Sequence, residues 1–220
     1  MTNVLLRGRI VVTPAALTLG IAAACWAVAV GQMRGMDMGV ATELGSFGFF
    51  IVVWVLMMAA MMLPGAVPAV LRCVHGARQA RAVPMFVASY LAVWAFVGVA
   101  VFSLYRPHGT TAAGVVAIAV GVYELTPFKR HCRERCRARV DSGLEFGLYC
   151  VGSSSGLMLI MVALSAMSIA WMAIVTVLVA GQKLLPRRAI LDVPLALVII
   201  ALGVLIIVAP ATIPDLMPAM

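Results

Sequence analysis

Methionine is the residue type whose number and spacing first indicate chemistry in this chain. There are 15 methionines in 220 residues, and four of them, Met57, Met58, Met61 and Met62, lie close together. Residues four apart share a helix face, so Met57 lies with Met61 and Met58 with Met62. A thioether is a soft, uncharged ligand that suits Cu(I). The quartet is therefore a candidate copper site; the alternative is helix packing, because methionine fills irregular gaps well.

A second methionine group lies in a short segment after the first apolar run. Met36 and Met38 flank Asp37, which could add an oxygen ligand. Methionine-rich segments of this kind resemble copper-capture loops, although an ordinary interfacial loop is the alternative. In the topology predicted from charge, this group and the quartet lie near opposite membrane faces, which would suit a path for an ion.

Two cysteines lie four residues apart in a strongly basic segment. If the segment is helical, Cys132 and Cys136 share a face, with His131 beside them. Two thiolates suit linear Cu(I) or part of a zinc site, and we expect the surrounding positive charge to lower the thiol pKa. The alternative is that the basic residues contact anionic lipid headgroups.

Glu124 is a carboxylate at the inner end of an apolar run. Ionisable side chains at membrane depth are costly and often functional, so Glu124 is a candidate metal ligand. The alternative is structural, because Lys129 and Arg130 lie close enough in sequence to pair with it.

Gly152 and Gly156 form a G-x-x-x-G pattern with three serines between them. Small residues allow helices to approach closely, and serines can hydrogen-bond across the contact. We expect this segment to face another helix rather than lipid.

These residues must be positioned by membrane helices. The chain is 64% hydrophobic and 11% charged, whereas soluble domains carry about 25% charged residues. Its apolar stretches are continuous and about 20 residues long, which is the length of a membrane-spanning helix. The composition therefore predicts an all-α polytopic transmembrane bundle, with residues 1–220 forming a single integral membrane domain.

Seven apolar runs can be distinguished. They are Ile10–Val30, Ser46–Leu63, Pro84–Tyr105, Thr111–Leu125, Gly147–Met167, Ile169–Leu185 and Ile190–Val208. With a cytoplasmic N-terminus, all of the 16 Lys and Arg residues except Arg34 and Arg106 lie on the cytoplasmic side, as the positive-inside rule favours. No charge occurs from Phe146 to Gln182, and charge placement favours a tight hairpin near Ser165–Ser168. One long helix there, giving six spans, is the alternative.

The motifs together resemble the DUF2182 family, described as predicted metal-binding integral membrane proteins of bacteria. The matching motifs are Trp54-x-x-Met57-Met58-Ala-Ala-Met-Met-Leu-Pro64, Tyr90-x-x-x-Trp94, Tyr123-Glu-Leu-Thr-Pro127-x-Lys129-x-x-Cys132-x-x-x-Cys136-Arg137, Cys150-Val-Gly152, Leu157-Met158, Trp171-Met172 and Lys183-x-x-Pro186. The family-like region covers about residues 36–186, with extra spans at 10–30 and 190–208. The resemblance implies a helical bundle in the bacterial cytoplasmic membrane and binding of a metal.

The sequence also departs from the family pattern. Ser153, Ser154 and Ser155 stand where the family has Cys-Cys-Trp, and Glu124 stands where glutamine is common. The resemblance makes Cys150 a candidate ligand, but the two neighbouring thiols of a three-cysteine site are missing here.

Two functions follow from these residues. The first is a membrane protein that binds, transfers or transports Cu(I) through methionine and cysteine sulfurs, with copper ion as the only expected cofactor or cargo. The alternative is a non-catalytic helical subunit of a larger membrane complex, such as a metal-dependent oxidoreductase. We expect no catalytic residues, because Glu124 is the only carboxylate or histidine placed at membrane depth. Expected partners are the lipid bilayer and other membrane subunits or a second copy, but not nucleic acid.

Overall fold

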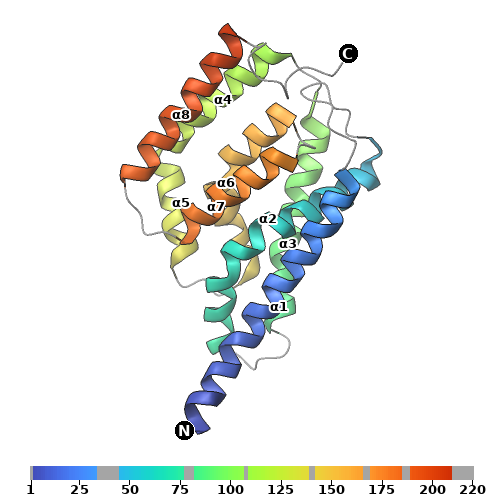
Figure 1. Ribbon diagram of the computed structural model, residues 1–220, viewed down its shortest axis with the longest axis vertical. Coiled ribbons are helices and arrows are strands. Elements are labelled where there is room, and N and C mark those ends of the chain that lie inside the picture. The colour runs from blue at the N-terminus through green and yellow to red at the C-terminus, as the bar shows by residue number, and fades with distance from the viewer. Residues whose placement is uncertain are drawn as a thin grey trace.

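The computed structural model shows a chain built from helices. The described residues are 2–33, 45–76, 82–106, 109–138, 142–165, 169–184 and 189–209. Within these ranges the chain forms eight helices and no strand (Figure 1). The helices are α1 (Thr2–Met33), α2 (Phe47–Gly76), α3 (Ala82–Leu104), α4 (Thr110–Glu124), α5 (Pro127–Arg137), α6 (Gly143–Ser165), α7 (Ile169–Leu184) and α8 (Ala189–Val208). The predicted all-α class is confirmed.

Each of the seven predicted apolar runs corresponds to a helix of its own, with ends that differ by a few residues, and the additional helix among the described residues is the basic α5. The largest difference in boundaries is in α2. The predicted run ends at Leu63, but the helix continues through Pro64 and Pro68 to Gly76. A proline removes one backbone hydrogen bond from a helix. Membrane helices tolerate this because neighbouring groups satisfy the freed backbone.

The apolar helices are those of a membrane protein. Among the described residues, α1, α2, α3 and α6 are each long and apolar enough to cross a membrane. The helices α4 and α5 meet the same criterion only as a pair, bent by 63°. The helices α7 and α8 are apolar but shorter. The polytopic membrane fold therefore agrees with the prediction, whereas seven spans and a cytoplasmic N-terminus remain predictions.

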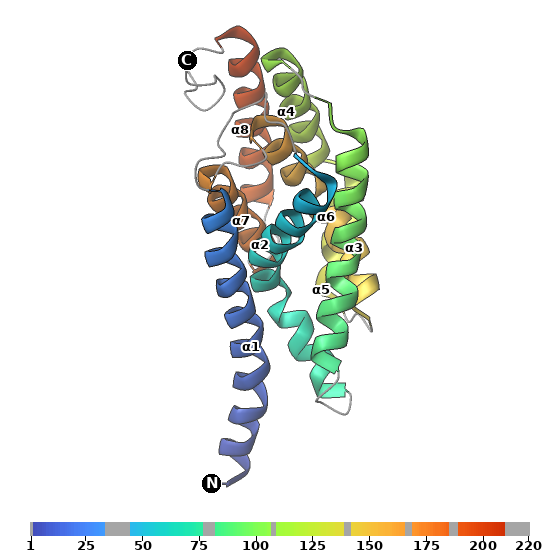
Figure 2. The same ribbon diagram turned by 90° about the vertical axis from the view of Figure 1, so that its right-hand side faces the viewer.

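The helix α2 lies at the centre of the bundle (Figures 1 and 2). It packs against α1, α3 and α7. In its apolar segment 67% is buried, compared with 17% in the apolar segment of α1. On the other side of the bundle α4 pairs with α8. A Cβ atom added to Gly114 would come within 2.8 Å of the Gly203 carbonyl oxygen, so small residues set this close contact.

The helices α6 and α7 form the predicted hairpin. The first ends at Ser165 and the second begins at Ile169. The chain then returns, because Lys183 near the end of α7 contacts Cys150 near the start of α6. One long helix, the alternative considered above, does not fit this return of the chain. Residues 166–168, where the turn is predicted, lie outside the described residues.

Basic residues gather at one end of the bundle. Arg72 of α2 donates hydrogen bonds to the carbonyl oxygens of Cys136 and Arg137 in α5. Arg137 in turn donates to the carbonyl oxygen of Lys183 in α7. This end, at which α2, α5 and α7 meet, contains the candidate site.

Candidate metal site

The helix α5 presents one face to the bundle and one to the exterior. Thr126 caps its first turn by accepting a hydrogen bond from the backbone N–H of Lys129, and Pro127 occupies the first turn. The buried face consists of Lys129, Cys132, Arg133 and Cys136. Arg130, His131, Glu134 and Arg135 are exposed. These two thiols and two cations are spaced three or four residues apart along one side of the helix, and that side faces the interior of the bundle.

Both cysteines of α5 contact the first half of α6. A Cβ atom added to Gly152 would lie 2.5 Å from the Cys132 Sγ, so the missing side chain makes room for this thiol. The Cys136 Sγ lies 3.9 Å from the Ser153 Oγ. The prediction that the two cysteines share a helix face is confirmed.

The environment of these thiols differs from the expected one. Taken alone, the basic α5 does not meet the criterion for a membrane span. Its cysteines are nevertheless buried, and burial raises the pKa of the Cys132 thiol. Burial, assisted by the neighbouring Cys150, raises the pKa of the Cys136 thiol to about 12, although Lys183 acts in the opposite direction. The expectation of lowered thiol pKa values was wrong because desolvation outweighs the nearby cations.

The Lys183 side chain contacts two sulfur atoms. Its ammonium group donates to the Cys150 Sγ at 2.8 Å and to the Met62 Sδ at 3.6 Å. The Tyr90 hydroxyl lies 3.2 Å from the same Cys150 Sγ, and the Phe146 ring centroid lies 5.8 Å from the ammonium nitrogen. Cys150, Met62 and Lys183 come from three different helices, so only the folded bundle creates this group.

A cavity of about 230 Å³ opens beside this group. Its lining comes from α2, α5, α6 and α7: Gly65, Pro68, Ala69, Arg72, Arg133, Cys136, Arg137, Phe146, Ser153, Lys183 and Leu184. These residues include four cations and one thiol but no carboxylate.

All four methionines of the quartet lie in the core. Met57, Met58, Met61 and Met62 are each at most 2% exposed. Met62 is the member whose sulfur contacts Lys183. Their burial fits both interpretations, since a core side chain packs whether or not its sulfur binds a metal. Met36 and Met38 lie outside the described residues.

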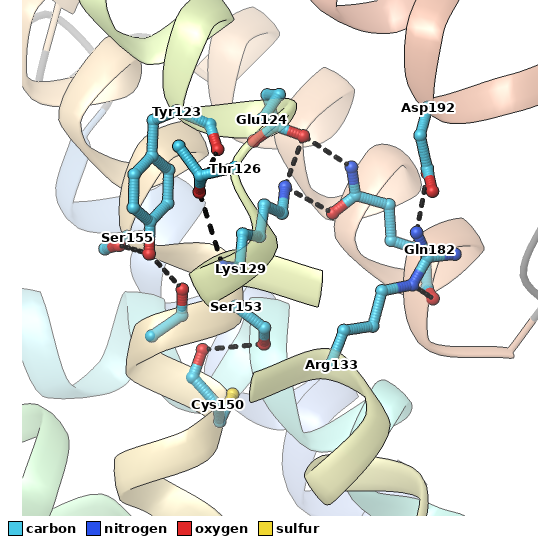
Figure 3. A network of polar contacts seen from close by, with 11 residues as sticks. Tyr123, Glu124, Thr126, Lys129, Arg133, Cys150, Ser153, Ser155, Gln182 and Asp192 are labelled. Carbon is cyan, nitrogen blue, oxygen red and sulfur yellow. Dashed lines mark hydrogen bonds and ion pairs between the residues drawn. The ribbon is translucent and has the colours of Figure 1, made fainter. Parts of the chain in front are cut away.

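Glu124 takes part in a buried polar network between α4, α5 and α7 (Figure 3). It forms an ion pair with Lys129, and the Gln182 side chain donates to its Oε2 at 3.0 Å. Lys129 also donates to the Gln182 Oε1 at 3.1 Å. The structural alternative for Glu124, pairing with Lys129, is thus present in the fold. Its second oxygen, Oε1, has no hydrogen-bond partner among the residues that the structure describes.

Ser153 and Ser155, two of the three serines that stand where the DUF2182 resemblance implies Cys-Cys-Trp, contact neighbouring helices. Ser153 donates to the Cys150 carbonyl oxygen at 3.0 Å, and Ser155 donates to the Tyr123 hydroxyl at 3.3 Å (Figure 3). Tyr123 in turn donates to the Gly152 carbonyl oxygen. The expected helix contact is confirmed, and it is made with α4 and α5.

The sequence did not identify Lys183, Gln182 or Asp192 as parts of this region. Arg133 donates to the Asp192 carboxylate at 2.6 Å and to the Gln182 carbonyl oxygen at 2.7 Å. One signal for Lys183 was available, because it ends a long uncharged stretch and belongs to the Lys183-x-x-Pro186 motif.

The described residues hold no group of three or more His, Cys, Asp and Glu side chains suited to a metal ion. The Cys150 thiol and the Met62 thioether do meet at Lys183, and the Cys136 thiol lines the cavity beside them. Such soft donors select Cu(I) over hard cations. A set of this kind differs from a zinc site, which takes up to four nitrogen, oxygen or thiolate ligands.

Comparison with known families agrees with this chemistry. A family model described as PpoB2, copper chaperone, matches residues 51–206, which is more than half of the chain. Comparisons with curated proteins and with solved structures found no match. The match supports the expected relation to copper, whereas the DUF2182 resemblance remains a prediction. The chain belongs to the PpoB2 copper chaperone family.

Proposed function

We propose that this protein is an integral membrane copper chaperone that holds Cu(I) through Cys150, Cys136 and Met62 and passes it on. The observation that carries the proposal is the convergence of the Cys150 and Met62 sulfurs on the Lys183 ammonium group, beside the cavity that Cys136 lines. The ammonium marks a point at which both sulfurs direct electron pairs toward a monovalent cation. Cu(I) carries the same charge and prefers these donors.

The ligand set suits transfer as well as binding. The cysteines must lose their protons when they bind copper, so binding releases protons. Met62 is neutral and holds the ion without adding charge. We propose that Met57, Met58 and Met61 extend the thioether donors from Met62 along α2 and that Cys132 lies on the receiving side of Cys136. Met36, Met38 and Glu124 stay candidate ligands in this proposal.

Titration with Cu(I) under reducing conditions, against a competing Cu(I) chelator, tests the proposal. We expect the Cys136→Ser/Cys150→Ser variant to bind Cu(I) at least about tenfold more weakly than the wild type, which corresponds to about 1.4 kcal/mol. Cys25→Ser is the matched control, because Cys25 lies on α1, outside the lining of the cavity. If the wild type binds no more copper than the double variant, the sulfurs serve packing and the complex-subunit function replaces this one.

A further inference from the structure

We propose that the cavity between α2, α5, α6 and α7 binds a small anionic thiol and that Cu(I) is exchanged with the protein as the complex of such a thiol. The inference rests on the proposed function and names the form in which the copper travels. It follows from the charge, the size and the thiol of the cavity.

The charge of the cavity is unfavourable for a free copper ion. Arg72, Arg133, Arg137 and Lys183 line it, and its lining in the described part of the chain includes no carboxylate. Like charges repel over such short distances, and buried groups are poorly screened by salt. A Cu(I) ion bound by two thiolates carries a net negative charge, so the positive lining of the cavity attracts it.

Partners of two kinds hold the arginine cations of the cavity in place. Arg133 is paired with Asp192. Arg72 and Arg137 donate instead to backbone carbonyl oxygens, those of Cys136 and Arg137 and that of Lys183 respectively. A carbonyl oxygen orients a guanidinium group but brings no negative charge. Arg72 and Arg137 are thus oriented by neutral groups, and their positive charges can bind an anion in the cavity.

The size and the remaining lining favour a small thiol. The volume of about 230 Å³ is below the roughly 300–1,000 Å³ of pockets for drug-sized ligands. Gly65, Pro68 and Phe146 form apolar walls, while Cys136 supplies the thiol. Gly65 leaves room for the Lys183 side chain, because an added Cβ atom would lie 2.6 Å from the Lys183 Cδ.

The exchange is a ligand substitution in which no electrons are transferred. The Cys136 thiol loses its proton and forms a Cu–S bond, while one Cu–S bond to the carrier breaks. The proton goes to the departing thiolate, which leaves as a neutral thiol group on an otherwise anionic molecule. A second exchange with Cys150 releases the other carrier in the same way, and the reverse steps load a carrier from the protein.

The test compares carriers that differ in charge, using the full chain in vesicles of neutral lipid. Cu(I) is supplied as its complex with 3-mercaptopropionate, 2-mercaptoethanol or cysteamine, whose second groups are anionic, neutral and cationic. The initial rate of copper transfer is measured for the wild type and for Arg72→Gln. The ratio of the two rates cancels differences in the intrinsic copper affinity of each carrier.

We expect the rate of the wild type divided by that of Arg72→Gln to be about tenfold for the anionic carrier, the lower end of electrostatic steering, because its two-thiolate copper complex is the most negatively charged. The ratio should be smaller but above one for the neutral carrier, whose complex carries a single negative charge, and below one for the cationic carrier, whose complex is positively charged. High salt should bring all three ratios toward one. Arg72→Lys keeps the charge and should keep the preference. Arg106→Gln, outside the cavity lining, is the matched control and should leave the ratios unchanged.

The outcomes separate the two proposals. If copper loads normally but the three ratios are equal, the anionic-thiol site is wrong and the copper site stands. If no carrier loads the wild type, the proposed function itself is wrong.

Discussion

At the scale of single residues, Lys183 is the most informative side chain. Its ammonium group contacts both the Cys150 and Met62 sulfurs, which are the donors proposed to bind Cu(I). A bound copper ion and the ammonium group therefore compete for the same electron pairs. A tethered competitor of this kind would weaken binding enough for the ion to leave, as a chaperone requires.

Replacing Lys183 with methionine tests this competition. Lys183→Met removes the competing charge, keeps a flexible side chain of similar length and adds a thioether. We expect copper release to a chelator to slow by about tenfold. If the rate of copper binding is unchanged, this corresponds to a binding free energy that is more favourable by about 1.4 kcal/mol. Stopped-flow transfer measures the release, and Lys183→Arg, which keeps the charge, is the control. Faster release from Lys183→Met would show that the lysine supports the site instead of competing for it.

Some residues of the site could be predicted from the sequence and others could not. Cys132 and Cys136 were predictable as a pair because their spacing alone places them on one helix face. Lys183 was not, because its partners come from α2 and α6 and depend on how the helices pack. The thiol pKa values were predicted in the wrong direction, since the sequence shows the nearby charges but not the burial.

At the scale of helices, the contact between α5 and α6 positions the site. It depends on Gly152, where an added Cβ atom would lie 2.5 Å from the Cys132 Sγ and 3.2 Å from the Cys132 Cβ. Neither helix can move away freely, because α5 is also tied to α2 and α7 by arginine hydrogen bonds.

Gly152→Ala should therefore destabilise the bundle by about 1–3 kcal/mol, the usual cost of overpacking. Gly48→Ala in α2 is the matched control, because an added Cβ atom there meets nothing within 4 Å. Thermal unfolding in detergent compares the two. The double variant Cys132→Ala/Gly152→Ala should recover part of the loss by removing the clashing sulfur. Equal midpoints for the two single variants would mean that the helices do not meet closely at this position.

The positions of the helices were largely predictable because long apolar runs leave the backbone few alternatives in lipid. The extension of α2 past Pro64 was not predicted, since a proline normally argues for the end of a helix. The pairing of α4 with α8 through Gly114 and Gly203 was also not visible in the sequence, because nothing local to either helix specifies its partner.

At the scale of the whole molecule, the uneven distribution of basic residues between the two ends of the bundle predicts which side of the membrane the cavity faces. Arg72, the basic α5 and Lys183 meet at one end. Basic residues favour the cytoplasmic side. The cavity is therefore predicted to open to the cytoplasm, where small thiols stay reduced.

Accessibility labelling of single cysteines checks this orientation. Probes at Ala138 and Arg187 should react from the cytoplasmic side, and a probe at Ala219 should react from the outer side. A cytoplasmic signal at Ala219 would contradict an odd number of spans, and an outer signal at Ala138 would reverse the whole molecule.

The central claim is that copper is held by sulfur from Cys150, Cys136 and Met62, and X-ray absorption at the copper K-edge of the Cu(I)-loaded protein tests it most directly. We predict a first coordination shell made only of sulfur, which loses one sulfur in Met62→Leu and is unchanged in Met85→Leu, where the methionine is 75% exposed. A first shell of nitrogen or oxygen, or one that is the same in wild type and Met62→Leu, would contradict the account.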